Sequence, residues 1–266
     1  MAERAAAARV IDRIDTGPRF TEADALRLNR RYEGASTLEL LAGVLNERVA
    51  GEVAVVSSFG AESAVLLHLI ARVDRATPVL FLDTLRHFPE TLAYRDALVA
   101  RLGLTGVVSL TPDPVLLARR DESALRWSYD PDGCCDIRKV QPLARALGAY
   151  DATITGRKGF QSATRAGLPR FEIDRSDAAG RLKVNPLADW SGTMLDGWFE
   201  AHDLPHHPLV AEGYPSIGCS PCTSKVAPGE DPRAGRWRGW QKVECGIHAP
   251  GAPDAGELPP GFDPVF

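Results

Sequence analysis

The sequence contains no long apolar run and no excess of basic residues. None of its apolar stretches approaches the ~20 residues that a membrane-spanning helix needs, and the N-terminal MAERAAAARVIDRI has no apolar core of a secretory signal. The formal net charge of −4 argues against a protein that mainly wraps nucleic acid or coats an anionic membrane. These absences predict a soluble cytoplasmic protein that has neither nucleic acid nor a membrane as a partner, and that binds any anion through local clusters of cations.

Cysteine is scarce as well, with five residues in 266. Cytoplasmic thiols are kept reduced, and a chain of this length buries enough surface to fold without disulfides, so a disulfide framework is not expected. Cysteine chemistry or metal binding is the better interpretation of these thiols.

Helical and strand patterns alternate through the first part of the chain. Apolar residues at helical spacing predict helices over 36–49, 62–73, 89–103 and 138–149, and short β-branched runs predict strands over 51–59, 78–83, 106–110 and 152–156. Such alternation predicts a single α/β domain whose central sheet is mostly parallel and is flanked by helices on both faces.

The pattern changes after Gly156. Residues 170–190 read as two short strands around a turn that contains glycine, and 191–204 as a helix with a Ser or Thr cap. Beyond Pro205 the sequence is rich in Pro, Gly, Cys, Arg and Trp, so it is ordered by something other than an apolar stripe, or not at all. The final APGAPDAGELPPGFDPVF reads as a flexible tail.

A candidate anion site follows the first predicted strand, in SSFGAES, Ser57 to Ser63. At such a turn the N–H groups of the helix N-terminus point outward and favour negative charge. Gly60 allows close backbone approach, and Ser58 and Ser63 offer hydroxyl groups. The chain has neither a Walker phosphate loop nor a GxGxxG dinucleotide pattern. By itself the segment fits a well-capped turn as well as it fits an anion site.

Basic residues form further clusters that could meet the same anion. Open α/β sheets bind ligands at the loops that follow their strands, and the clusters are Arg138 with Lys139, Arg157 with Lys158 and Arg165, and Arg233 with Arg236 and Arg238. Any single one of these would be read as a solvated surface charge. Trp237 and Trp240 would suit stacking on single-stranded nucleic acid, but the acidic chain favours a small anionic ligand.

Four cysteines form two pairs, the adjacent Cys134 and Cys135 and the CSPC of Cys219 and Cys222. Such a set suits zinc or an iron–sulfur cluster, while buried apolar thiols and a CxxC redox pair are the competing interpretations. Ligands of structural zinc are typically about two to four residues apart, so the adjacent pair favours a cluster.

The fifth cysteine, Cys245, lies in WQKVECGIH. Nearby cations lower the pKa of a thiol and activate it as a nucleophile. Arg238, Lys242 and His248 are candidate cations, whereas Glu244 opposes them. A glycine-rich tail would let this thiol reach a bound substrate and then a partner protein; the alternative is an incidental exposed thiol.

Several segments together resemble, in order and across nearly the whole chain, the assimilatory adenylyl-sulfate (APS) reductases of the phosphoadenylyl-sulfate reductase family. These segments are SSFGAES, LDTLRHFPET, CCDIRKVQPL, TGRKGFQSATR, VNPLADW, GCSPCT and GRWRGWQKVECGIH. The resemblance implies an adenine nucleotide α-hydrolase-like reductase domain with an iron–sulfur site over 1–228. It implies an Arg/Trp segment and a tail with the catalytic cysteine over 229–266. Leu85 stands where the family usually has glycine.

The resemblance also implies roles for individual residues, with Cys245, Lys139 and His248 catalytic. The ligands of a 4Fe-4S cluster match Cys134, Cys135, Cys219 and Cys222, and the nucleophile matches Cys245. A lysine between cluster and substrate matches Lys139, and the phosphate loop matches Ser58, Gly60 and Ser63. The groups that face the sulfate and phosphate match Arg165, Arg233, Arg236 and His248.

The implied reaction is thioredoxin-dependent reduction of APS to sulfite and AMP, in sulfate assimilation and cysteine biosynthesis. Cys245 would attack the sulfur of the sulfate, and thioredoxin would release sulfite from the enzyme S-sulfocysteine. Four cysteines favour APS over its 3′-phosphorylated form, because the cluster distinguishes APS enzymes from cluster-free relatives. The alternatives are a reductase for 3′-phosphoadenylyl sulfate, an ATP pyrophosphatase of the same superfamily, and a zinc or nucleic-acid binding module. Whether the chain forms a homo-oligomer stays open.

Overall fold

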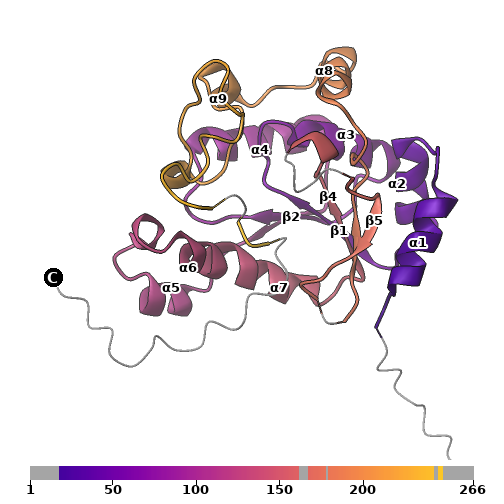
Figure 1. Cartoon of the computed structure of the whole chain (residues 1–266), viewed down its shortest axis with the longest axis horizontal. Coiled ribbons are helices and arrows are strands. Elements are labelled where there is room, and N and C mark those ends of the chain that lie inside the picture. The colour runs from indigo at the N-terminus through magenta and orange to yellow at the C-terminus, as the bar shows by residue number, and fades with distance from the viewer. Residues whose placement is uncertain (1–17, 162–166, 178, 243–244, 248–266) are drawn as a thin grey trace, which may run out of the picture.

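Strands of the described chain form one six-stranded sheet in the order β3-β2-β1-β4-β6-β5 (Figure 1). The computed structural model describes residues 18–161, 167–177, 179–242 and 245–247. All neighbouring strands are parallel except β5 and β6, which are antiparallel. The strands are β1 Val53–Ser57, β2 Val79–Leu82, β3 Val107–Leu110, β4 Ala152–Thr155, β5 Phe171–Ile173 and β6 Leu182–Val184.

Helices cover both faces of this sheet, as the alternating sequence pattern predicts (Figure 1). The α-helices are α1 Glu22–Arg31, α2 Thr37–Leu45, α3 Ser63–Val73, α4 Pro89–Leu102, α5 Pro114–Arg120, α6 Pro131–Cys135, α7 Gln141–Leu147, α8 Gly192–Ala201 and α9 Pro208–Ala211. Within the described residues, no helix combines the length and the apolarity needed to cross a membrane.

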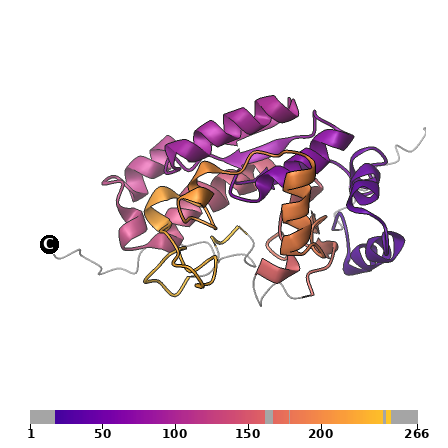
Figure 2. The same cartoon turned by 90° about the horizontal axis from the view of Figure 1, so that it is seen from above.

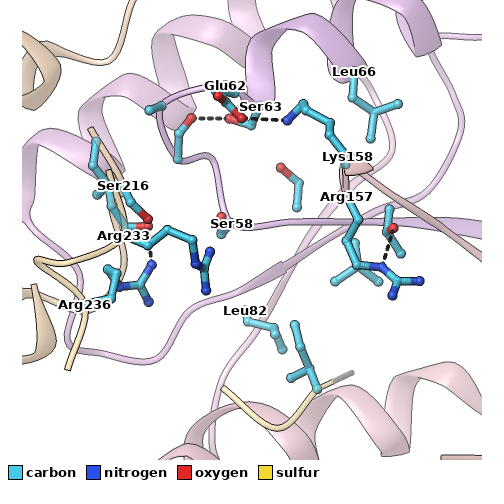
Figure 3. Close-up of a pocket in the computed structure, with 18 residues that line it drawn as sticks. Ser58, Glu62, Ser63, Leu66, Leu82, Arg157, Lys158, Ser216, Arg233 and Arg236 are labelled. Carbon is cyan, nitrogen blue, oxygen red and sulfur yellow. Dashed lines mark hydrogen bonds and ion pairs between the residues drawn. The ribbon is translucent and has the colours of Figure 1, made fainter. Parts of the chain in front are cut away.

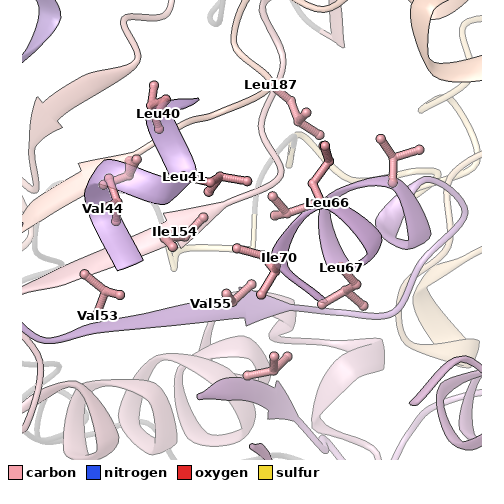
Figure 4. Packing of buried hydrophobic residues seen from close by; sticks show 14 of the residues in the cluster. Leu40, Leu41, Val44, Val53, Val55, Leu66, Leu67, Ile70, Ile154 and Leu187 are labelled. Carbon is pink, nitrogen blue, oxygen red and sulfur yellow. The ribbon is translucent and has the colours of Figure 1, made fainter. Parts of the chain in front are cut away.

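Alternate residues of the central strands pack into different layers. On β1, Val53 and Val55 join the large core formed with α2 and α3 (Figure 4), whereas Ala54 faces a smaller cluster that includes Leu143 and Leu147 of α7. Because successive side chains of a strand point to opposite faces, a strand buried on both sides reads as a continuous apolar run. The parallel sheet predicted from those runs is confirmed.

Local signals in the sequence account for the helix ends. Ser36 caps α2 by accepting a hydrogen bond from the Glu39 N–H, and Glu39 in turn accepts from the Ser36 N–H. Gly103 ends α4 with a φ of 65°, a left-handed conformation that glycine adopts without strain. All the predicted helices and strands are present, with ends that differ by a few residues.

Four helices of the described chain, α1, α5, α6 and α9, were not among the predicted elements, and one predicted helix is divided. The segment 138–149 begins in a π-helix, Asp136–Val140, which continues α6 before α7 starts. Single π-turns of this kind widen the helix locally and often lie at functional sites. Here the turn contains Lys139 directly after the two adjacent cysteines.

The chain from α9 to Trp240 lies beside α6, at the end of the molecule away from α1 (Figures 1 and 2). It contains little regular structure: a short 3₁₀ turn, Ser220–Cys222, and an isolated bridge between Thr223 and Arg236. The Trp237 N–H also donates to the carbonyl of Cys222 at 3.0 Å. The division predicted at residue 228 stays a prediction, and the predicted tail 249–266 lies outside the described residues.

Candidate functional site

A pocket of about 230 Å³ lies at the carboxyl ends of β1, β2 and β4 (Figure 3). Its floor includes Ser57, Leu82 and Thr155, the last residues of those strands. Its other wall comes from the C-terminal part of the chain, with Arg236 and Ile247 among the lining residues. Ligands of open α/β sheets bind at this edge, so the pocket is the candidate site.

The predicted anion loop forms the first wall, with Ser58, Gly60 and Ser63 all lining the pocket. The left-handed residue of the turn is Phe59, with a φ of 47°, and not Gly60. Phe59 is fully buried, and its ring meets the edge of Phe81 at 5.5 Å between centroids. Core packing thus holds a strained backbone at the start of the loop, a feature that is common at binding sites.

Gly60 and Ser63 serve the loop differently from what their sequence suggests. A Cβ at Gly60 would lie 3.4 Å from both the Ile217 carbonyl oxygen and the Ser58 hydroxyl, so the protein has some room for a side chain there. The Ser63 hydroxyl donates to the Gly60 carbonyl at 2.6 Å and is thereby used within the turn.

Cations face the pocket from two sides. Figure 3 shows Arg233 and Arg236 on one side and Lys158 on the other. The Lys158 side chain is 3% exposed, and its ammonium lies 2.7 Å from Oε2 of Glu62, at the N-terminus of α3. Arg157 turns away, because its guanidinium donates to Glu172 and to Oδ1 of Asn185. The pocket therefore carries an excess of positive charge, which suits an anion.

Arg236 connects the pocket to the cysteines. Its guanidinium donates to the Ile217 carbonyl at 3.2 Å and lies 4.5 Å from the ring centroid of Trp237. It rests on Gly218, where a Cβ would lie 2.2 Å from Nη2 of the arginine. Burial lowers the pKa of Arg236, while Cys245 and Cys219 act in the opposite direction. Only glycine at position 218 leaves room for the Arg236 guanidinium where it lies.

The four paired cysteines come together beside Arg236, although 84 positions separate Cys135 from Cys219. Cys134, Cys135 and Cys219 are buried, and Cys222 is half-buried. Burial, with a smaller contribution from the nearby Cys219, raises the pKa of Cys134, that of Cys135 to about 12 and that of Cys222 to about 11. Within the described residues, no three His, Cys, Asp or Glu side chains are grouped as ligands of one metal ion. The cluster stays a prediction.

Lys139 faces this group of thiols. Burial opposes its protonation, but the negative potential of Cys219, Cys245 and Cys135 outweighs burial and raises the pKa of Lys139. The reverse effect is seen at Cys219: burial alone would raise its pKa, but Lys139, the Thr84 hydroxyl and Arg236 lower it. Lys139 and Cys219 therefore stabilise each other's charged forms.

Two residues that position this group were not found from the sequence. Thr84, fully buried after β2, lies 3.3 Å from the Cys219 sulfur through its hydroxyl, and its carbonyl accepts from Arg138. Asp121 forms a buried ion pair with the same Arg138. Both residue types are common at strand ends and helix caps, so nothing in their local pattern marks them.

Cys245 lies next to both the thiols and the pocket. It is close enough to Cys135, Lys139 and Arg236 to shift their pKa values, and Ile247 lines the pocket two residues later. Cys245 is half-buried. The thiol predicted to be the nucleophile is thus at the junction between the pocket and the cysteine group.

The remaining predicted cations have other positions. Arg165 and His248 lie outside the described residues. Arg138 is held in its buried pair with Asp121, and Arg238 pairs with Glu230 at 3.1 Å on the surface. Neither Arg138 nor Arg238 lines the described pocket, so the expectation that they meet its anion is wrong for this arrangement. Both are charges whose partners are carboxylates of the same chain.

Comparisons with known proteins agree with this geometry. The model of the phosphoadenosine phosphosulfate reductase domain matches residues 52–225. The chain is 49% identical over 243 residues to the adenosine 5′-phosphosulfate reductase of Mesorhizobium japonicum. This alignment covers 91% of this chain and 94% of that protein. It is 41% identical over 229 residues to the phosphoadenosine 5′-phosphosulfate reductase of Gloeobacter violaceus. This second alignment covers 84% of this chain and 92% of that protein.

A solved structure shows the same similarity. The phosphoadenylyl-sulfate reductase of Candida auris, crystallised as a phosphate complex, has a TM-score of 0.63 and 25% sequence identity. The alignment covers 78% of this chain and 98% of that chain.

Proposed function

The chain belongs to the phosphoadenosine phosphosulfate reductase family, and from this premise we propose that it reduces adenosine 5′-phosphosulfate (APS) to sulfite and AMP. The observation that carries the proposal is the junction of a cationic pocket with one thiol, Cys245, which interacts with Lys139 and Arg236. A pocket that only binds an anion has no use for a thiol at its edge, and a thiol without an anionic substrate has no use for the cations of the pocket. Together they indicate a reaction of the thiol with a bound anion.

The phosphosulfate would lie between the loop Ser57–Ser63 and the two arginines Arg233 and Arg236. Lys158 on the far side adds a third cation, and its pairing with Glu62 keeps it fixed before substrate binds. The outward N–H groups at the N-terminus of α3 favour a phosphate. We assign Ser58, Gly60, Ser63, Arg233 and Arg236 to substrate binding, together with Arg165 from outside the described residues.

In the first step the Cys245 thiolate attacks the sulfur of the sulfate group. The new S–S bond forms as the bond from sulfur to the bridging oxygen breaks, and AMP leaves with that electron pair. Both reactants are negatively charged, so Lys139 and Arg236 lower the barrier by stabilising charge on the sulfonyl oxygens and the leaving phosphate. His248, which the resemblance also makes catalytic, lies outside the described residues.

In the second step a dithiol protein of the thioredoxin type releases sulfite. One of its thiolates attacks the Cys245 sulfur and expels sulfite, which leaves a mixed disulfide. The second thiol of the dithiol protein then attacks that protein's own sulfur in the mixed disulfide, which releases the Cys245 thiol and leaves the dithiol protein oxidised. The two electrons that convert sulfate sulfur into sulfite thus come from the dithiol, and no other reductant is required.

The donor set of Cys134, Cys135, Cys219 and Cys222 fits a 4Fe-4S cluster better than one zinc ion. A zinc ion needs its ligands around one point, whereas the thiolates of a cluster bind separate iron atoms. Lys139 and the Thr84 hydroxyl, which lower the pKa of Cys219, would favour the thiolate that a metal requires. When bound, the cluster would supply fixed charge beside Lys139 and hold the two cysteine segments together.

A second candidate function is reduction of the 3′-phosphorylated substrate, which is the substrate in the name of the Gloeobacter relative. The four cysteines favour APS by the resemblance described above. Comparison of kcat/KM for the two nucleotides, with thioredoxin and thioredoxin reductase present, separates the candidates. We expect sulfite and AMP in equal amounts from APS, with the higher kcat/KM. A higher value for the 3′-phosphorylated nucleotide would contradict the proposal, and pyrophosphate release from ATP would replace it by a pyrophosphatase.

A further inference from the structure

A second pocket, of about 260 Å³, shares no lining residue with the pocket described above and is lined in part by Pro221 and Cys222. Trp127, Trp237 and Trp240 form its aromatic walls, and Pro131 and Pro221 complete its apolar surface. We refer to these five residues as the tryptophan pocket. None of them takes part in the reaction proposed above.

The pocket is built on strained and well-fixed backbone. Trp237 has a φ of 47°, which is rare for a bulky residue, and its N–H donates to the Cys222 carbonyl at 3.0 Å. Trp237 is 4% exposed, and the Arg236 guanidinium and the Lys242 ammonium lie 4.5 Å and 5.6 Å from its ring centroid. Trp240 at the rim remains 44% exposed. A pre-formed aromatic groove with an open rim is the kind of surface that binds proline-rich segments.

The chain has such a segment close at hand. Residues 248–266 contain five prolines and the sequence LPPGF at 258–262. They carry three acidic side chains and no lysine or arginine, so they are not repelled by Arg238, which lines the pocket, or by Lys242, whose ammonium lies 5.6 Å from the Trp237 ring centroid. Adjacent prolines favour the polyproline II conformation, which loses little entropy when it binds.

The length of the tail is sufficient to reach the pocket. Ile247, the last described residue, follows Trp240 by seven residues, so the two lie no more than about 25 Å apart along the chain. Pro259 follows Ile247 by twelve residues, which spans roughly 20 Å as a flexible coil and about 37 Å when extended. LPPGF can therefore return to the tryptophan pocket of its own chain.

We propose that residues 258–262 of the tail dock in the tryptophan pocket of the same chain. The segment between Trp240 and Leu258 then forms a loop that is attached at both ends and carries Cys245. Because both partners belong to one chain, their effective concentration is in the millimolar range, and a contact too weak to form between separate molecules is populated. The proposal does not depend on the reaction assigned to Cys245.

Footprinting with X-ray-generated hydroxyl radicals tests the docking, because mass spectrometry reads the oxidation of each tryptophan separately. The full-length chain is compared with Pro259→Ala/Pro260→Ala and with a matched control, Pro250→Ala/Pro253→Ala, in the same tail. We expect loss of docking to raise the oxidation rate of Trp240 about twofold in the first variant only. Trp190 and Trp198, whose ring centroids lie 5.5 Å apart outside the tryptophan pocket, serve as internal references.

Two further measurements identify the occupant. A peptide of residues 256–266, added at about millimolar concentration to the Pro259→Ala/Pro260→Ala variant, should restore protection of Trp240, and the same peptide with both prolines replaced by alanine should not. Tenfold dilution of the full-length chain should leave protection unchanged. The proposal is overturned if both double variants match the full-length chain, if both lose protection equally, or if protection falls on dilution, which would assign the pocket to a second copy.

Discussion

The two walls of the anion pocket are built by different means. The first, Ser57–Ser63, joins β1 to α3 and is anchored by Phe59 in the largest apolar cluster. The second, residues 216–242 and 245–247, has little regular structure and is held by single contacts, such as those of Arg236 with Gly218 and Ile217. Burial of apolar surface stabilises the first wall, while a few polar contacts and thiols hold the second. Substitutions in the second wall should therefore change activity more than they change overall stability.

The largest effect should come from the thiol of the second wall. Cys245→Ser should lower sulfite formation by about a thousandfold or more, because a neutral hydroxyl is a poor nucleophile here. AMP binding by calorimetry and the urea unfolding midpoint should stay unchanged, since the thiol is half-buried and lies outside the two apolar clusters of the described chain. Normal turnover by this variant would remove Cys245 from the mechanism.

Lys139→Ala should reduce kcat by about a hundredfold or more, which is typical of losing one preorganised charge. The iron content and visible absorption of the anaerobically purified variant should match those of the unsubstituted chain. Lys225→Ala, which removes a lysine that lies over the Tyr214 ring instead, is the matched control and should retain full activity. A colourless Lys139→Ala protein would show that the lysine holds the cysteine segments rather than the transition state.

Acid should weaken a contact outside both walls, where the fully buried His207 at the start of α9 lies 3.0 Å from the Thr91 hydroxyl of α4. Burial lowers the pKa of His207 from 6.5 to about 4. The unfolded state therefore takes up a proton at higher pH than the folded state, and stability is lost as pH falls from 6.5 towards 4. The contribution is about 3 kcal/mol.

Urea unfolding at a series of pH values measures this contribution. His207→Gln should flatten the fall in unfolding free energy between pH 6.5 and 4. His206→Gln, at the neighbouring exposed histidine, should leave the fall unchanged. Equal slopes for the chain with and without His207 would contradict the assignment.

The smallest effect should follow from one methyl group beneath Arg236. Gly218→Ala would place a Cβ 2.4 Å from the Arg236 Cζ, so the guanidinium must move while its charge remains. We expect affinity for AMP to fall about tenfold, equivalent to about 1.4 kcal/mol. Gly197→Ala in α8, where a Cβ meets nothing within 4 Å, is the control and should leave affinity unchanged. Unchanged affinity in Gly218→Ala would mean that the position of Arg236 is unimportant.

Much of the first wall can be predicted from the sequence, because its signals are local. The apolar run of β1, the SSFGAES turn and the periodicity of α3 are neighbours in the chain, and together they place an anion loop at a strand end. The left-handed conformation at Phe59 could not be predicted, because it is stabilised by a core contact with Phe81 from another strand. Leu85, with a φ of 59°, is also in the left-handed region, which glycine adopts without strain.

The sequence by itself determined the alternation of helices and strands, and hence a mostly parallel sheet with a pocket at its strand ends, the edge where open α/β sheets bind ligands. It also determined which residue types were available for chemistry, above all five cysteines and several arginines. Only the tertiary structure decided which of these meet. Arg236 reaches the pocket whereas Arg138 and Arg238 pair with carboxylates, and Thr84 and Asp121 position the thiols and their neighbours. Such choices depend on contacts between residues far apart in the chain, and these form only when the whole sheet is in place.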